Sequence, residues 1–169
     1  MWYAAANDHS EIVQSLVEQG ADMEKASVSG TTPLWIASFK GHLTIVHYLW
    51  DQGTDRNKIG GLVEDTILGA AVEKGHLRVV SCLIEQGADM EKADNNGNTP
   101  LMIASCCGHL EVTRYLLEQG ANRDKVSDDG MTSLHYASYG HLETVKLLMS
   151  YGADLNARNS DGDLPINME

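Results

Sequence analysis

Histidine is the reactive residue type that recurs most regularly in this chain of 169 residues. Five of the seven histidines are separated by 33, 34, 33 and 32 residues; they are His9, His42, His76, His109 and His141. Imidazole serves acid–base catalysis and metal binding. However, equivalent positions on successive packed helices lie about 10 Å apart, too far for two of them to share a metal with bonds of about 2 Å. We therefore expect these five histidines to be structural, hydrogen-bonded where two helices meet.

The remaining reactive residues form no recognisable catalytic or metal-binding set. We expect His135 to be structural and His47 to lie on the outer face of its helix. Three cysteines are an odd number, and none has zinc-finger spacing. A site made of Cys106, Cys107 and His109 would need further ligands that the sequence does not offer. Because the chain also lacks a glycine-rich phosphate loop and a Gly-x-Ser-x-Gly turn, we expect no catalytic residue, no cofactor and no metal.

Composition limits the partners and the compartment. The chain has 12 Lys+Arg against 24 Asp+Glu, a net charge of −12, which disfavours nucleic acid and acidic partners. Residues of hydrophobic type make up 43% of the chain, yet no apolar run approaches the ~18 residues of a membrane span. No basic segment precedes an apolar stretch at the start, so we expect no secretory signal. The cysteine pattern favours a reducing compartment, the cytoplasm or the nucleus.

Glycines repeat with the histidines and define a helical segment. Five of them show the same four intervals, and each lies 11 residues after its histidine. Apolar residues between the two have helical spacing, as in 77–84 and 110–117. A glycine at the end fits the left-handed position that terminates a helix. We expect these five glycines to end the second helix of each repeat: Gly20, Gly53, Gly87, Gly120 and Gly152.

A shorter helix precedes each histidine. Thr32-Pro33-Leu34 and Thr99-Pro100-Leu101 place a threonine where it can cap a helix and a proline at the first helical position. Small residues follow, and the segment ends at Gly41 or Gly108, directly before the histidine. This is the first helix of each repeat.

These residues resemble the ankyrin repeat family. Its Thr-Pro-Leu-His opening and Gly-His-Leu junction are matched by 32–35 with 41–43, by 99–102 with 108–110, and more loosely by 132–135 with 140–142. The resemblance implies an all-α ankyrin solenoid of stacked helix-turn-helix units with β-hairpin-like loops. It covers the whole chain as one domain, 1–169, with repeats at about 1–26 (partial), 27–60, 61–93, 94–126, 127–158 and 159–169 (partial).

Several departures from the family pattern carry expectations of their own. Repeat three has an extra residue near Gly60-Gly61, and the first helix of repeat five is one residue short, so we expect local instability at both places. Neither end has the polar cap that an array needs, which suggests a piece of a longer array or of a larger protein. The duplicated Ala-Asp-Met-Glu-Lys-Ala segments at 21–26 and 88–93 indicate repeat copying rather than a motif.

The resemblance implies a non-enzymatic module that binds another protein through its hairpin tips and the exposed face of its first helices. Apolar residues at the first two tips and paired aspartates at the fourth predict a partner with an apolar anchor at one end and Lys or Arg at the other. We expect a monomer. The tips are Val28-Ser29, Leu62-Val63, Asn95-Asn96, Asp128-Asp129 and Ser160-Asp161.

The first-helix face adds aromatic and charged candidates. Phe39 and Tyr139 are the expected anchors, because aromatic residues are enriched among binding hot spots; partial packing against their own repeats is the alternative. Trp35 is either such a hot spot or a packing residue between repeats, with packing favoured, and Trp50 is expected in the core. The full predicted partner-binding set is Val28, Ser29, Trp35, Phe39, Lys40, Leu62, Val63, Asp65, Glu73, Lys74, Asn95, Asn96, Asp128, Asp129 and Tyr139.

Two other functions remain open from the sequence. The chain could be the regulatory or targeting segment of a larger enzyme, kinase or channel, or an inhibitor that covers an enzyme surface. A further domain beyond residue 169 would favour the first of these.

Overall fold

The computed structural model describes residues 1–55 and 66–167. The chain divides into two units, Met1–Ala88 and Asp89–Glu169, and each is described by itself. Within the described residues there are α-helices and one 3-10 helix, and no strand. The helices are α1 (Trp2–Ala6), α2 (Ser10–Glu18), α3 (Pro33–Lys40), α4 (Leu43–Asp51), α5 (Ile67–Glu73), α6 (Leu77–Glu85), α7 (Pro100–Cys106), α8 (Leu110–Glu118), α9 (Ser133–Ala137), α10 (Leu142–Ser150) and η1 (Pro165–Asn167).

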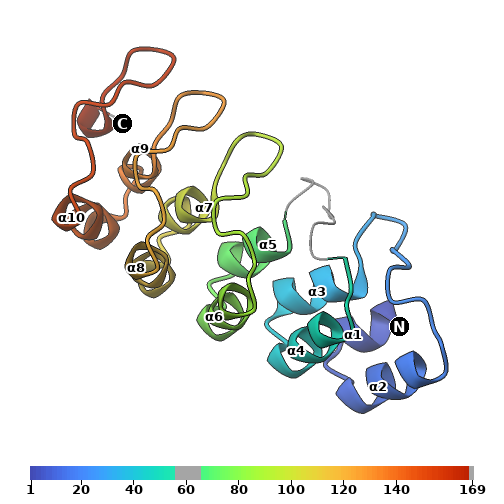
Figure 1. The fold of residues 1–169 in the computed structure, drawn as a ribbon. Coiled ribbons are helices and arrows are strands. Elements are labelled where there is room, and N and C mark those ends of the chain that lie inside the picture. Colours follow the sequence, from blue (N-terminus) through green and yellow to red (C-terminus); the bar gives the residue numbers. More distant parts are fainter. Residues whose placement is uncertain (56–65, 168–169) are drawn as a thin grey trace. The chain divides into compact units, whose positions relative to one another are not determined.

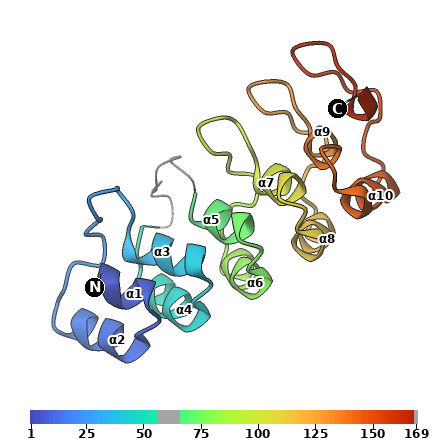
Figure 2. The same ribbon diagram turned by 180° about the vertical axis from the view of Figure 1, so that it is seen from behind.

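Helices alternate between two rows in each unit. In the first unit α1, α3 and α5 pack side by side as first helices, and α2, α4 and α6 form the row of second helices (Figure 1). In the second unit α7, α9 and η1 make up one row and α8 and α10 the other, as the view from behind also shows (Figure 2). The predicted helix pairs and the all-α class are confirmed.

The first helices begin at threonine caps. The side chains of Thr32, Thr66, Thr99 and Thr132 each accept a hydrogen bond from the backbone N–H three residues later. A proline occupies the first turn of α3 and of α7, where its missing N–H costs nothing. These starts are the ones that the sequence predicts.

The second helices end at left-handed glycines, as predicted. The φ angles of the five repeating glycines lie between +78° and +90°. Their helices bury one apolar face, which supplies the core of each unit. Its fully buried members include Val13, Val46, Leu49, Val80, Leu83, Leu116 and Leu148.

Repeat five has the shortened first helix that the sequence predicts. Helix α9 has 5 residues, whereas α3 has 8 and α7 has 7. Gly140, which follows it, has a φ of +130°, whereas Gly41 and Gly108 at the equivalent place have +79° and +68°. The missing residue is thus absorbed at the helix end. Gly60-Gly61, the other expected weak place, lies outside the described residues.

Amide hydrogen exchange should show the effect of this shortening. We expect the backbone amides of α9 to exchange faster than those of α7, because fewer helical hydrogen bonds must open together. Exchange followed by mass spectrometry or NMR on the full chain measures both helices at once. Equal protection of α9 and α7 would contradict the expectation.

No helix in the part of the chain that the structure describes is long and apolar enough to cross a bilayer.

Candidate protein-binding surface

The repeating histidines join neighbouring repeats. The Nε2 atoms of His42, His76 and His141 donate to the backbone carbonyl oxygens of Ala6, Phe39 and Cys106, at 3.3, 3.1 and 2.8 Å. Each bond links the start of a second helix to the end of the first helix in the preceding repeat. The structural role predicted for these histidines is confirmed at the three junctions.

The two histidines outside the series also lie where they were expected. His135 is fully buried; its Nδ1 accepts from the backbone N–H of Thr132 at 3.1 Å, and its Nε2 donates to the carbonyl of Asp163 at 3.2 Å. His47 is exposed on α4, with its Nδ1 3.0 Å from a carboxylate oxygen of Asp51. His135 therefore holds α9 against the loop that follows, while His47 faces outward.

Two of the three cysteines, Cys82 and Cys106, have a raised pKa. Burial raises the pKa of Cys106. Burial also raises the pKa of Cys82, and the carboxylates of Glu85 and Asp51 add to this. The thiolate is the reactive form of cysteine, so these shifts lower reactivity. Among the described residues no three His, Cys, Asp or Glu side chains come together to hold a metal ion.

Neighbouring hairpin tips in the second unit are joined by backbone hydrogen bonds. The backbone N–H of Asp128 donates to the carbonyl of Asn96 at 3.1 Å, and that of Ser160 donates to the carbonyl of Asp129 at 2.9 Å. Three successive tips are thereby linked backbone to backbone. In Figure 1 the loops before α7, α9 and η1 extend to the same side of this unit.

Within a hairpin, a polar side chain at the start of the tip accepts hydrogen bonds from backbone N–H groups further along the tip. Asp94 Oδ1 accepts from the N–H groups of Asn96 and Asn98 at 2.9 and 2.8 Å. In the last hairpin Asn159 Oδ1 accepts in the same way, from residues two and four positions later. Tyr136 on α9 donates its hydroxyl to Asn98 Oδ1 at 2.6 Å. The tips are therefore held both internally and from the helix beneath them.

Tip side chains in the second unit point to solvent, where a partner can reach them. All four of the predicted residues, Asn95, Asn96, Asp128 and Asp129, are exposed. Among the described residues neither aspartate of the pair forms an ion pair with a cationic side chain. The row thus presents uncompensated negative charge.

In the first unit the predicted tip is apolar and exposed. Val28 is fully exposed, and Ser29 beside it is exposed as well. The predicted tip residues Leu62 and Val63, together with Asp65, lie outside the described residues.

The first-helix face of this unit carries an aromatic stack. Phe39 is half-buried and stacks on Trp35, with ring centroids 5.0 Å apart, and Lys74 Nζ lies 4.5 Å from the Phe39 ring centroid. Glu73 accepts from Lys74 at 2.6 Å. Lys40 is exposed. Phe39, Lys74 and Glu73 therefore form one partly exposed cluster on α3 and at the end of α5.

Trp35 was included in the predicted partner-binding set, but the structure places its side chain in the interior. It is 7% exposed and lies behind Phe39. Trp2, at the same repeat position, donates its Nε1 to Thr31 in the following hairpin at 2.7 Å. Packing between repeats is the role that the structure gives this position, so Trp35 is not a surface residue. Trp50 is buried, as expected.

Tyr139 is exposed at the end of α9, and the adjacent cysteines Cys106 and Cys107 are exposed at the end of α7. The second unit thus offers an aromatic ring on the first-helix face in addition to its acidic tips.

One set of inter-repeat contacts was missed by the sequence reasoning. Carboxylates of Glu24, Glu91 and Asp124 accept from backbone N–H groups in the next repeat, at 2.7, 2.7 and 3.1 Å. The duplicated segments that contain Glu24 and Glu91 are therefore more than a trace of repeat copying. An acidic residue at one fixed repeat position was the available signal.

Comparison with known families agrees with this geometry. A family model described as ankyrin repeats (3 copies) matches residues 1–94 and 68–159. The chain belongs to the ankyrin repeat family. Ankyrin repeats are generally protein–protein interaction modules and are typically non-enzymatic. A comparison with curated proteins gave no significant match.

Proposed function

We propose that this ankyrin chain is a non-enzymatic module that binds a partner protein through its hairpin tips and the exposed face of its first helices. The observation that carries the proposal is the row of tips in the second unit. Its backbone is fixed by hydrogen bonds between tips, while its side chains remain exposed. Such a surface loses little conformational entropy on binding, because it is already ordered.

The chemistry of the tips supports a basic contact on the partner. Asp128 and Asp129 are exposed, and Asp161 at the next tip adds a third carboxylate. Lys or Arg side chains of a partner would gain charge-assisted hydrogen bonds there. Complementary charge of this kind raises the association rate and selects partners.

An apolar contact is proposed for the first unit. Val28 is fully exposed at its tip, and Phe39 and Lys74 form a partly exposed cluster on the first-helix face. Tyr139 plays the same part in the second unit. Ser29, Lys40, Glu73, Asn95 and Asn96 complete the proposed surface, together with Leu62, Val63 and Asp65 from the sequence. The free cysteines support a reducing compartment, the cytoplasm or the nucleus.

Reversing the charge of the proposed basic-contact site should abolish partner capture. We expect an Asp128→Lys, Asp129→Lys variant to retain less than about a tenth of the partner that the unaltered chain retains, since losing two charged contacts costs more than the 1.4 kcal/mol that corresponds to tenfold. The measurement is affinity purification from the source cells with quantitative mass spectrometry, followed by titration of the identified partner.

The control variant carries the same change in net charge elsewhere. Glu85→Lys, Glu118→Lys alters two exposed glutamates at the ends of second helices, away from the tips. It should retain the partner, and both variants should unfold at the same temperature as the unaltered chain. Equal retention by the two variants would contradict the proposed site, and Phe39→Ala then tests the first-helix face separately.

A further inference from the structure

Asn96, at the tip of the hairpin before α7, is the one asparagine of the sequence that is followed by glycine. In such a pair the backbone nitrogen of the glycine can attack the side-chain amide carbon of the asparagine, because glycine has no Cβ that hinders the approach. Asparagine is accordingly one of the thermolabile residues. The Asn96-Gly97 pair is therefore a place where the chain can change chemically without an enzyme.

The fold itself requires the glycine of this pair. Gly97 has a φ of +76°, in the region that glycine enters without strain. A Cβ on Gly97 would lie 2.8 Å from the backbone nitrogen of Asp128 and 2.6 Å from Oδ1 of its carboxylate. A larger residue would have to push the neighbouring tip away. The reactive pair is thus a consequence of how closely the two tips approach each other.

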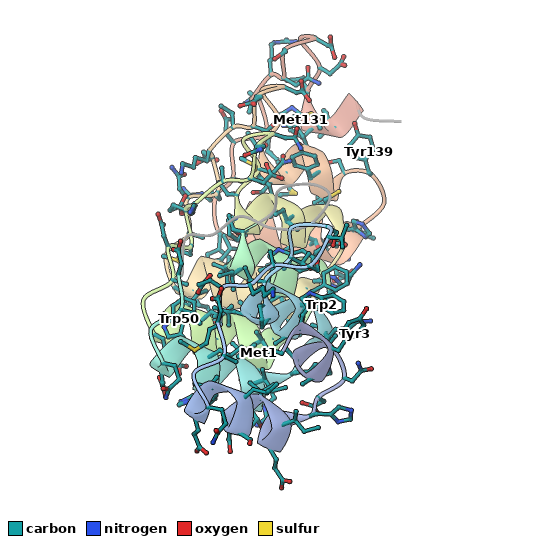
Figure 3. All side chains as sticks on the ribbon, turned by 90° about the vertical axis from the view of Figure 1, so that its right-hand side faces the viewer. Met1, Trp2, Tyr3, Trp50, Met131 and Tyr139 are labelled. Atoms are coloured by element: carbon teal, nitrogen blue, oxygen red, sulfur yellow. The ribbon has the colours of Figure 1, made fainter. Side chains whose placement is uncertain are left out.

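The Asn96 side chain is accessible to water. It is exposed, and its amide group has no hydrogen-bond partner among the described residues. Asn98 differs, because it accepts from the Tyr136 hydroxyl at 2.6 Å and donates to Asp94 at 3.1 Å. Its position lies inside the hairpin, since Met131, its equivalent in repeat five, is buried (Figure 3). Of these two asparagines, Asn96 alone has a side chain that is free to react.

Backbone hydrogen bonds hold the closed tip in a form that does not react. The Gly97 N–H donates to the carbonyl of Asp94 at 3.1 Å, so the nitrogen that must attack is occupied. The Asp94 carboxylate also accepts from the N–H groups of Asn96 and Asn98. The reaction therefore needs these bonds to open. Exposed loops are among the segments of a protein that open most readily.

Aspartate at position 96 is compatible with this fold, since the next two tips already have aspartate there. Asp129 and Asp161 occupy the equivalent position, and each is followed by a glycine with positive φ. The carbonyl of Asp129 accepts from the N–H of Ser160, as that of Asn96 accepts from Asp128. Conversion of Asn96 to aspartate thus leaves the bond between the tips in place and adds a carboxylate beside Asp128.

We propose that Asn96 is a site of spontaneous deamidation, which gives its tip the aspartate that the two following tips carry. The Gly97 nitrogen forms a bond to the side-chain carbon of Asn96, and its proton leaves with the amide nitrogen as ammonia. The succinimide ring that results is opened by water at either carbonyl. One opening gives aspartate, and the other gives isoaspartate, which has the same charge and a backbone longer by one CH₂.

The modification also changes the partner-binding surface, and this part of the inference rests on the function proposed above. It extends the row of exposed tip carboxylates, Asp128, Asp129 and Asp161, to the tip of repeat four. Because ammonia is lost, the step does not reverse. Older molecules therefore carry more negative charge at the tips than newly made ones, and they should bind a basic partner more tightly.

Ageing of the folded full chain tests the chemical step. Protein kept at physiological temperature and mildly alkaline pH is digested and mapped by mass spectrometry. We expect Asn96 to gain the mass of an acid over an amide well before Asn156, an exposed asparagine of the same unit that is followed by alanine. Isoaspartate should appear at position 96 as well. The rate should rise with pH, because the attacking nitrogen must lose its proton.

Two variants test whether opening of the tip controls the reaction. Asp94→Ala removes the carboxylate that accepts two backbone hydrogen bonds, so Asn96 should convert faster while Asn156 converts as before. Asn96→Gln should lose the early mass gain. An unchanged melting temperature shows that both variants are folded. The proposal is overturned if Asn96 converts no faster than Asn156, or if Asp94→Ala leaves the rate at Asn96 unchanged.

Asn96→Asp represents the product in a binding measurement. The probe is a fluorescent oligolysine peptide, and Asn156→Asp, which adds the same charge outside the tips, is the control. We expect Asn96→Asp to bind about 1.5- to 5-fold more tightly than the control, as one exposed ion pair allows. Equal affinities overturn the effect on binding. If Asp128→Lys, Asp129→Lys also binds the peptide like the unaltered chain, the proposed function fails instead, and the mass measurement still decides the deamidation.

Discussion

Replacing Gly41 by alanine should lower the free energy of unfolding by about 2–4 kcal/mol, which is more than the same change should cost at Gly20. Gly41 has a φ of +79°, and a side chain in the left-handed region costs about 1–2 kcal/mol. A Cβ there would also lie 2.7–2.9 Å from three ring atoms of His76. The ring must move, and its 3.1 Å hydrogen bond to the Phe39 carbonyl is lost, which adds about 1 kcal/mol or more.

Gly20 provides the matched control in the same unit. Its φ is +78°, and nothing lies within 4 Å of a Cβ built on it. Gly20→Ala should therefore cost only the backbone term of about 1–2 kcal/mol. Urea denaturation followed by circular dichroism measures both variants. Equal losses at the two glycines would show that the histidine contact contributes nothing measurable.

Replacing His135 by alanine should lower the free energy of unfolding by about 3–4 kcal/mol. The ring is fully buried, and its removal leaves the N–H of Thr132 and the carbonyl of Asp163 without the partners that they have now. A cavity forms as well. Loss of the bond to Asp163 should loosen the last hairpin, which would then be held to its neighbour by the Ser160–Asp129 bond and by the contact of Asn159 with Met131.

Two measurements separate this effect from a general loss of stability. Hydrogen exchange should show that the amides of residues 159–163 lose protection before those of α7 do. His47 on α4 gives the control, because its side chain is exposed. His47→Ala should lower the free energy of unfolding by less than about 0.5 kcal/mol. A His135→Ala variant with a protected last hairpin would contradict the assigned role.

Features set by local rules could be predicted from the sequence. Threonine caps, first-turn prolines and left-handed glycines each depend on the residue itself and its chain neighbours, and all lie where they were expected. The histidine role followed from periodicity alone, since residues at one repeat position cannot converge on one site. The tips at Val28 and Asp128 were placed by the resemblance to the ankyrin repeat family, and both are exposed.

Contacts between neighbouring repeats were harder to predict. The carboxylate of Glu91 lies 2.7 Å from the N–H of Asn122, 31 positions later, and the sequence contains no rule that sets this distance. Trp35 is a second case, in which the sequence left the burial of a side chain open. A tryptophan at a position where the family places histidine could be surface or core, and only the stacked Phe39 ring in front of it shows which.

The direction of the inter-repeat bonds has a consequence for how such a gene can change in length. A junction histidine, a turn amide and a tip amide in one repeat all find their acceptors in the repeat before it, as at His141, Asp154 and Ser160. If one whole repeat is removed or duplicated, the donors of each remaining repeat still face the acceptors of the repeat before it. A single residue can be gained or lost at a helix end, as at α9, but a cut that removes much of a helix or hairpin leaves both sets unmatched. Among large insertions and deletions, those of whole periods should therefore be the ones that selection tolerates.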